Sequence, residues 1–355
     1  MSKFFSAKYS KLQPYVPGEQ PSDLKRFVKL NTNESPFAPS QKACDYALRN
    51  TRQLNLYSDP NCVKLTEMIA QTYNVDKEMV MVGNGSDEIL NFAFMSFTDQ
   101  KVPALFADIT YGFYPVFADL NNSAYEIIPL HKDFSLSVDD YIGKKGTVFI
   151  ANPNAPTGMT IKVSEIERLV ASDPDRVVVI DEAYVDFGAE SCIPLTKKYD
   201  NLLVCQTFSK SRSFAGGRLG YGIGSASLIQ DLNTIKYSTN PYNVNSMTSA
   251  MGIGILSDPE YMKDNCQKII DNRNYTVNEL KKLGFEVLPS CSNFIFVKAP
   301  NLDGGLYYKK LKEAGVLVRH FDKKRISDWC RVSIGTKESM DIFLEQTKKI
   351  LEANK

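Results

Sequence analysis

The sequence predicts an α/β protein with two parts: a large domain in which helices cover both faces of a mostly parallel sheet, and a smaller α+β domain. Three observations support this prediction. The 355 residues are enough for two domains. In the middle of the chain, short apolar runs alternate with amphipathic runs, which is typical of βαβ units. After about residue 240, one long helical stretch and several short strand-like runs replace this alternation.

The alternating region begins with a helix, a strand and a second helix. Asp59-Pro60 is typical of a helix start, and apolar residues from Leu65 onward follow at helical spacing. We expect a strand over residues 79–82 and the second helix over about residues 87–97. Three further runs have the Val, Ile, Leu and Phe content of buried parallel strands, at residues 147–151, 177–180 and 202–206.

The later part of the chain predicts the smaller domain. A long helix is expected over residues 259–283, and an amphipathic pattern predicts a closing helix over residues 337–353. Between them we expect a helix around residues 306–314 and strands at residues 285–288, 293–297, 316–318 and 331–334. We therefore divide the chain into three parts. Residues 1–40 are an N-terminal segment that has no sheet of its own and packs on the small domain. The large domain covers residues 41–250, and the small domain covers residues 251–355.

Composition argues against several classes of protein. The 42 Lys and Arg balance 41 Asp and Glu, and a net charge of +1 gives no general attraction to nucleic acid. The basic run Lys323-Lys324-Arg325 is interpreted as a solvated surface turn. No run of about 20 apolar residues predicts a membrane span, and the first 15 residues lack a secretory signal pattern, so we expect a cytoplasmic protein. Seven scattered Cys and two His favour reduced thiols and argue against a zinc site.

Ligands of such sheets bind beyond the carboxyl ends of the strands, so the residues that follow each strand are the first candidates for a binding site. Gly83-Asn84-Gly85-Ser86-Asp87-Glu88 follows the strand at residues 79–82. Its glycines and the free N–H groups of the next helix suit a phosphate, although a tight turn explains the same residues. Glu88 replaces the last glycine of the dinucleotide fingerprint, and no P-loop pattern occurs, which disfavours both kinds of nucleotide site.

Three other strand endings carry chemically useful side chains. Asn152-Pro153-Asn154-Ala155-Pro156-Thr157-Gly158 is a rigid turn with amides, and Asp181-Glu182-Ala183-Tyr184 places a carboxylate where a helix cap is the alternative. Thr207-Phe208-Ser209-Lys210-Ser211 is followed by Arg218, eight residues past the lysine. A single lysine is usually a surface charge. At a strand end beside a carboxylate, amides and a phosphate cradle, however, Lys210 is a candidate nucleophile of the Schiff-base type.

These four endings, in this order, resemble the fold type I aminotransferases that use pyridoxal 5'-phosphate, the aspartate aminotransferase-like family. The shared signatures are N-P-x-x-P-T-G at residues 152–158, D-E-A-Y at 181–184 and S-K-x-x-x-x-x-G-x-R at 209–218, and the resemblance covers nearly the whole chain. Within that family the sequence is most similar to the histidinol-phosphate aminotransferases, through motifs at residues 12–15, 29–36, 57–60, 110–112, 241–245, 315–319 and 331–336.

The resemblance implies roles for the residues around the cofactor ring. Lys210 would bind the cofactor covalently and move the substrate proton, and Asp181 would keep the pyridine nitrogen protonated. Tyr184 and an asparagine would hold the ring hydroxyl, and Tyr111 would stack on the ring. The family has asparagine directly before the proline of P-T-G, where this chain has Ala155, so Asn154 is the candidate for that contact.

The resemblance also implies how the cofactor phosphate is bound and that two subunits are needed. The predicted phosphate contacts are Gly85, Ser86, Asp87, Ser209 and Arg218. In this family a tyrosine placed like Tyr57 reaches the phosphate from the neighbouring subunit. The resemblance therefore implies a homodimer and no catalytic metal.

For the substrate, the resemblance implies histidinol phosphate and 2-oxoglutarate or glutamate, in histidine biosynthesis. Arg331 matches the arginine that binds the substrate carboxylate, Arg319 matches a second arginine, and Tyr15 resembles a tyrosine that closes over the substrate phosphate. Arginine suits both anions because its planar fork binds carboxylate and phosphate through two hydrogen bonds. The alternatives are a decarboxylase of the threonine-phosphate type and an aromatic amino acid aminotransferase. A non-catalytic regulator would need a fused DNA-binding domain, which we do not expect here.

Overall fold

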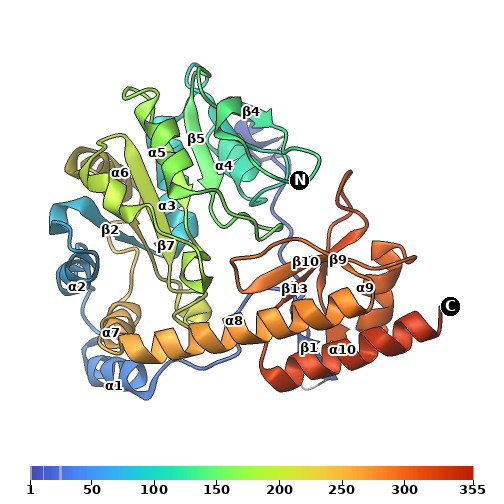
Figure 1. Cartoon of the computed structure of the whole chain (residues 1–355). Coiled ribbons are helices and arrows are strands. Elements are labelled where there is room, and N and C mark those ends of the chain that lie inside the picture. Colours follow the sequence, from blue (N-terminus) through green and yellow to red (C-terminus); the bar gives the residue numbers. More distant parts are fainter. Residues whose placement is uncertain (1, 11, 24–25, 355) are drawn as a thin grey trace.

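The computed structural model describes residues 2–10, 12–23 and 26–354, and it contains one large and one smaller sheet (Figure 1). The large sheet lies among helices in the first two thirds of the chain, and the smaller sheet lies beside it with the C-terminal helices. Helix α8 (Pro259–Lys282) extends from the helices below the large sheet to the smaller sheet (Figure 1). None of the helices in the described residues is long and apolar enough to cross a membrane.

The large sheet has seven strands. In spatial order they are β2 (Val80–Gly83), β8 (Gly220–Ile223), β7 (Leu202–Thr207), β6 (Val178–Asp181), β5 (Thr147–Ala151), β3 (Ala104–Ala107) and β4 (Tyr125–Ile128). Strands β7, β6, β5, β3 and β4 are parallel, whereas β8 is antiparallel to both of its neighbours. The mostly parallel sheet predicted from the sequence is therefore confirmed.

Helices cover both faces of this sheet because successive strand residues point to opposite sides. In β6, Val178 and Ile180 belong to one apolar cluster and Val179 to the other. Each such buried side chain contributes about 1.5–3 kcal/mol. On one face, the first cluster is covered by α2 (Val63–Tyr73), α5 (Val163–Ala171) and α7 (Ser246–Leu256), and α1 (Gln41–Asn50) packs on α7. On the other face, the second cluster is covered by α3 (Ser86–Phe97), α4 (Tyr114–Leu120) and α6 (Ala226–Thr239).

The smaller sheet is antiparallel. Its order is β12 (Arg319–His320), β13 (Trp329–Ser333), β10 (Phe294–Lys298) and β9 (Glu286–Val287), and it is packed with α8, α9 (Gly304–Glu313) and α10 (Lys337–Glu352). A separate parallel pair joins β1 (Val28–Lys29) to β11 (Val316–Leu317). The sequence predicted no strand before residue 40. Two residues are too few to show the alternation by which a strand is predicted, so β1 was missed.

Helix α2 begins three residues later than its predicted start. Cys62 is the N-cap residue, in a left-handed conformation with φ of 47°, and the helix starts at Val63. Asp59 still caps the helix, because its carboxylate accepts hydrogen bonds from the backbone N–H groups of Asn61 (2.9 Å) and Val63 (2.8 Å). Asp59 therefore caps the helix as predicted, although three residues separate it from the first helical residue.

Candidate functional site

The carboxyl ends of the central strands open into a cavity of about 310 Å³. Parallel pairing sets Ala151, Asp181 and Cys205 side by side at this edge, so the residues that follow β5, β6 and β7 meet there. All four strand endings singled out in the sequence contribute to the wall. It includes Ser86, Asp87, Pro153, Asp181, Ser209 and Lys210.

Lys210 lies in the loop after β7 and lines this cavity. Its Nζ is 3.5 Å from the carbonyl oxygen of Thr32 and 5.7 Å from the centre of the Tyr184 ring. Thr32 belongs to the N-terminal segment and Tyr184 to the segment after β6. Three parts of the chain that are distant in sequence therefore surround one primary amine, which can act as a nucleophile and carry a proton.

Asp181 ends β6 and is buried, with 5% of its surface exposed. It accepts hydrogen bonds from the backbone N–H of Ala183 (3.1 Å) and the hydroxyl of Tyr114 (3.2 Å). The described residues place no cationic side chain within ion-pair distance of it. Burial therefore raises the pKa of Asp181 from 3.8 to about 6. A buried carboxylate of this kind is suited to a ligand that brings its own positive charge.

The other end of the cavity is built to hold an anion. Helix α3 begins there at Ser86, and its free N–H groups favour a negative group. The Arg218 guanidinium lies 3.3 Å from the Asp87 carboxylate and 3.4 Å from the Ser209 hydroxyl. Gly85 has φ of +85°, and a Cβ at this position would lie 2.7 Å from Arg218 Nη2. The turn therefore requires glycine for its conformation and for the space that Arg218 fills.

Two tyrosines stand between these ends. The Tyr111 hydroxyl donates to Asp87 Oδ1 at 2.6 Å, and burial together with the Asp87 charge raises the pKa of Tyr111 well above its ordinary value. The Tyr184 hydroxyl accepts a hydrogen bond from Asn33 Nδ2 at 3.1 Å, and its ring contacts the Phe294 ring edge to face at 5.0 Å. Both rings line the cavity in fixed orientations.

Asn154 is not brought to this cavity. Its side-chain amide donates to the Ile109 carbonyl and to Thr157 Oγ1, both at 3.0 Å, and its Oδ1 accepts from Thr110 Oγ1 at 2.8 Å. Ala155, one residue later, lines the wall in its place. The predicted contact of Asn154 with a ring hydroxyl therefore does not fit the geometry, because the amide points away from the cavity, towards the segment after β3 and Thr157 of its own turn.

A second cavity of about 520 Å³ adjoins the first. Residues that line both cavities are Thr32, Tyr111, Ala155, Tyr184 and Lys210. The outer wall contains Tyr15, Arg319 and Arg331, the three predicted substrate residues. Lys210 therefore lies at the junction between an inner compartment with a buried carboxylate and an outer compartment with two arginines.

The two arginines face each other across antiparallel strands. Arg319 in β12 pairs with Arg331 in β13, which places both guanidinium groups on one side of the sheet. Arg319 donates to the carbonyls of Val16 (3.2 Å) and Pro17 (3.3 Å), and Arg331 donates to that of Asn31 (3.1 Å). Burial first, and the charge of Arg319 in addition, lower the pKa of Arg331. The buried Nε of Arg331 has no hydrogen-bond partner among the described residues, so it can donate a hydrogen bond to a bound anion.

Tyr57 lies outside both cavities. Its side chain is 85% exposed, and its ring stacks on that of Tyr242 at 4.7 Å. The reach of Tyr57 into a neighbouring subunit stays a prediction.

Several residues of the site were not predicted from the sequence. Tyr114 carries the hydroxyl that bonds Asp181, but its position in an apolar helix gives no sign of this. Asn33 lies in a motif that was noted without a role. The basic run forms the expected exposed turn, and in addition Lys323 lines the outer cavity and Arg325 forms a 2.6 Å ion pair with Asp108.

Comparisons with known proteins agree with this architecture. The sequence model of the family "Aminotransferase class I and II" matches residues 25–346. A histidinol-phosphate aminotransferase of Clostridium botulinum (strain 657 / Type Ba4) is 46% identical over 353 residues, which is 99% of each chain. One from Brachyspira hyodysenteriae is 47% identical over 354 residues, covering 99% of this chain and 100% of the relative. The crystal structure of a histidinol-phosphate aminotransferase from Sinorhizobium meliloti in complex with pyridoxal-5'-phosphate has the same fold, with a TM-score of 0.88, 20% identity and 99% coverage of both chains.

Proposed function

The chain belongs to the class I and II aminotransferases, and among them to the histidinol-phosphate aminotransferases, and from this premise we propose how its two cavities transfer an amino group between histidinol phosphate and 2-oxoglutarate. The enzyme is a pyridoxal-phosphate-dependent transaminase. The observation that carries the proposal is the position of Lys210, which lines both cavities. An amine at this junction can reach a cofactor on one side and the reacting carbon of a substrate on the other.

The residues of the inner cavity fit pyridoxal phosphate. Asp181 is a buried carboxylate with no cationic side chain of the described residues at ion-pair distance, as a protonated pyridine nitrogen requires. At the opposite end, Ser86, Ser209 and Arg218 surround the start of α3, which suits a phosphate. When bound, the cofactor supplies an electron sink for the electron pair left by the broken Cα–H bond. Tyr111 and Tyr184 would hold the ring between these two ends.

The chain's own residues would then position the substrate and move its proton. Lys210 Nζ would take the proton from the substrate Cα and return it on the cofactor side. Asp181 would keep the ring nitrogen protonated throughout, because the buried carboxylate is stabilised by that charge. Tyr184, held by Asn33, would fix the ring hydroxyl without a contact from Asn154.

The outer cavity is proposed to recognise two anions in turn. Arg331, with its unpartnered Nε, would bind the carboxylate of glutamate. Arg319 and Tyr15 would bind the phosphate of histidinol phosphate, because an arginine fork matches a dianionic phosphate. Since the two guanidinium groups lie on the same face, one compartment can serve both half-reactions.

We further propose that the active form is a cytoplasmic homodimer in which Tyr57 reaches the cofactor phosphate of the partner subunit. The exposed position of Tyr57, outside the cavities of its own subunit, supports this assignment. The division into a cofactor-binding domain at residues 41–250 and a smaller domain at 251–355, with residues 1–40 packed on the latter, is proposed with it.

Rates with histidinol phosphate, histidinol, phenylalanine and threonine phosphate test the substrate assignment. We expect histidinol phosphate to be the best amino donor and the loss of its phosphate to reduce turnover most. Phenylalanine matching it would favour the aromatic aminotransferase, and stoichiometric carbon dioxide from threonine phosphate would favour the decarboxylase. Borohydride reduction should fix the cofactor on a Lys210 peptide, and label on another residue would contradict the role of Lys210.

A further inference from the structure

The loop that carries Lys210 is weakly tied to the rest of the protein by its backbone. Between residues 208 and 219, the described backbone–backbone hydrogen bonds all join residues of the loop itself, such as Ser213 N–H to Lys210 O (3.3 Å) and Phe214 N–H to Phe208 O (3.0 Å). Ser213 and Arg218 also have positive φ angles, of 53° and 50°. Side chains must therefore fix the position of this loop.

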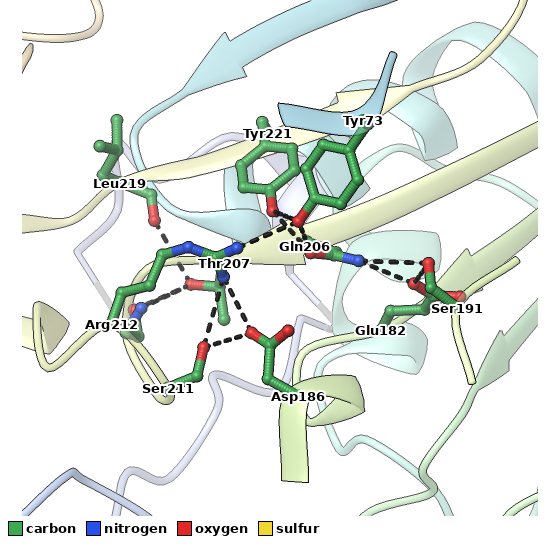
Figure 2. Close-up of polar contacts among 11 residues, drawn as sticks. Tyr73, Glu182, Asp186, Ser191, Gln206, Thr207, Ser211, Arg212, Leu219 and Tyr221 are labelled. Atoms are coloured by element: carbon green, nitrogen blue, oxygen red, sulfur yellow. Dashed lines mark hydrogen bonds and ion pairs between the residues drawn. The ribbon is translucent and has the colours of Figure 1, made fainter. Parts of the chain in front are cut away.

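Arg212, two residues after Lys210, provides such an anchor (Figure 2). Only 6% of its surface is exposed. Its guanidinium donates to Asp186 Oδ2 at 2.9 Å and to the Tyr73 hydroxyl at 3.0 Å, and it lies over the Phe208 ring at 5.2 Å. Ser211 donates to the same Asp186 oxygen at 2.5 Å. The two residues that follow Lys210 are thus bound to one carboxylate.

Asp186 belongs to the segment that carries the other catalytic side chains. It lies in the short 3-10 turn Val185–Phe187, directly after Asp181 and Tyr184. The ion pair between Arg212 and Asp186 therefore connects the Lys210 loop to the end of β6. Breaking such a buried pair is costly, because the remaining charge has no compensation.

A second chain of hydrogen bonds leads from Arg212 to the residue next to Asp181 (Figure 2). Tyr73 contacts the Tyr221 hydroxyl at 2.6 Å, and Tyr221 donates to Gln206 Oε1 at 2.6 Å. Gln206 Nε2 then donates to the Glu182 carboxylate at 2.8 Å. Ser191 Oγ (2.6 Å) and the Cys192 backbone N–H (2.5 Å) complete the donors to Glu182. The buried positive charge of Arg212 is in this way connected to two acidic residues on either side of Tyr184.

We propose that Arg212 is a positioning residue that holds the Lys210 amine in place in the cavity that Asp181 and Tyr184 also line. It lines neither cavity, so it acts on the reaction through the loop rather than by contact with a ligand. The inference rests on the proposed role of Lys210 and adds to it the device that keeps the amine in place.

Three substitutions test this role. Arg212→Met keeps much of the side-chain volume but removes the fork, and Arg212→Lys keeps a charge beside Asp186 without reaching Tyr73 as well. The matched control is Arg176→Met. Arg176 is equally buried, at 5% exposed, but it donates to the carbonyls of Tyr141 (2.8 Å), Lys144 (3.1 Å) and Leu169 (3.3 Å), away from the cavities.

Hydrogen exchange of the cofactor-free protein reports on the loop without any assumption about activity. We expect peptides covering residues 208–218 to exchange faster in Arg212→Met, less so in Arg212→Lys, and at the unmodified rate in Arg176→Met. In the loaded enzyme, we expect the visible circular dichroism of the cofactor to change and kcat to fall about 100-fold in Arg212→Met, with KM within a few-fold, because a displacement near 1 Å can cost that much.

Unchanged exchange, circular dichroism and kcat in Arg212→Met would overturn the proposal, as would equal effects of Arg176→Met on the loop and kcat. If Arg212→Met gives no folded protein, Arg212→Lys decides: normal loop exchange and normal kcat would overturn it. An unmodified enzyme that fails to bind pyridoxal phosphate would instead contradict the proposed function, and the exchange result would still test the anchor.

Discussion

At the scale of single residues, the buried carboxylate of Asp181 gives a prediction about stability. In the cofactor-free protein its pKa is about 6 rather than 3.8, so folding favours the protonated form. The stabilisation is complete below pH 3.8 and is lost as the pH rises towards 6. Two pKa units correspond to roughly 3 kcal/mol. We expect the unfolding free energy of the unmodified protein to fall relative to that of Asp181→Asn by this order between about pH 4 and 6, as measured by chemical denaturation.

Bound cofactor should reverse this effect, because a protonated ring nitrogen favours the ionised carboxylate. The same denaturation series with saturating pyridoxal phosphate is therefore the control. A difference between the two proteins that does not depend on pH in the cofactor-free state would contradict the assigned titration of Asp181.

The sequence was sufficient to choose candidate site residues at the ends of strands, but not to predict the directions of side chains in irregular turns. Asp181 is the last residue of buried strand β6 and Lys210 lies three residues after buried strand β7, and the regular geometry of these strands sets where such residues lie. Asn154 lies in a turn with two prolines, where a shift of one residue turned its amide away from the cavity. Tyr114 and Asn33 reach the site through tertiary packing, which no local pattern reports.

At the scale of secondary-structure elements, the turn between β2 and α3 predicts a specific cost for Gly85→Ala. The new Cβ would lie 2.7 Å from Arg218 Nη2 at a φ of +85°. We expect this variant to lose at least about tenfold in affinity for pyridoxal phosphate, since displaced Arg218 can no longer contribute a charge-assisted bond worth about 1.5–3 kcal/mol.

Gly143→Ala is the matched control for this experiment. Gly143 has φ of +80°, but a Cβ there would meet no atom within 4 Å. It should therefore lose about 1 kcal/mol of stability through backbone strain while its cofactor affinity stays unchanged. Equal affinities of the two variants, from equilibrium titration of the cofactor, would exclude the proposed clash.

The pairing of β12 with β13 gives a prediction about substrate specificity. Arg319 and Arg331 lie on one face of the smaller sheet, so a substitution of either arginine leaves the other one in the same compartment. We expect Arg319→Ala to reduce kcat/KM for histidinol phosphate by about 10- to 150-fold, the value of one charge-assisted contact of 1.5–3 kcal/mol. The loss with glutamate should be smaller, because Arg331 still binds its carboxylate. Equal losses with both substrates would argue against a phosphate role for Arg319.

Several long or strongly patterned elements were predicted, but β3 was missed, because Ala104–Ala107 is short and half of its residues are alanines, which are uncommon in strands. Strands β5, β6 and β7 and helices α8 and α10 lie within a few residues of their expected bounds. Strand β8 was missed because two of its four residues are glycines, which have low strand propensity. Strand β4 was missed because it has only four residues and Glu126 interrupts its apolar residues.

At the scale of the whole molecule, the exposed Tyr57 predicts that two subunits share each active site. A Tyr57→Ala subunit keeps its own Lys210, and a Lys210→Ala subunit keeps its own Tyr57. When the two weak variants are mixed and allowed to exchange, half of the dimers contain one intact site, so activity should recover to about one quarter of the unmodified level. Activity that stays at the sum of the separate variants would place Tyr57 outside the partner's site.

The two sheets are joined by contacts on the side of the outer cavity. Arg325 pairs with Asp108 at 2.6 Å and donates to the carbonyl of Leu130 at 3.0 Å. Next to this pair, a shared apolar cluster takes Phe134 from the segment after β4 and Phe296 and Trp329 from strands β10 and β13 of the smaller sheet. The relative placement of the sheets, which sequence patterns could not reveal, thus depends on side chains far apart in the chain.

Helix α8 connects the helices of the large sheet to the smaller sheet, and its length affects how the two can move relative to each other. Its 24 residues run without interruption from Pro259 to Lys282, a rod of roughly 36 Å at about 1.5 Å per residue. Midway along it, Arg273 donates to the carbonyls of Phe187 (2.9 Å) and Ser292 (2.8 Å), which follow the Asp181 segment and precede β10. Because Arg273 lies about 21 Å from the Pro259 end and about 14 Å from the Lys282 end, a tilt of about 5° around it would move these ends by roughly 2 Å and roughly 1 Å. A movement of the smaller sheet that tilts α8 would therefore also act, through Arg273 and Phe187, on the segment that carries Asp181 and Tyr184.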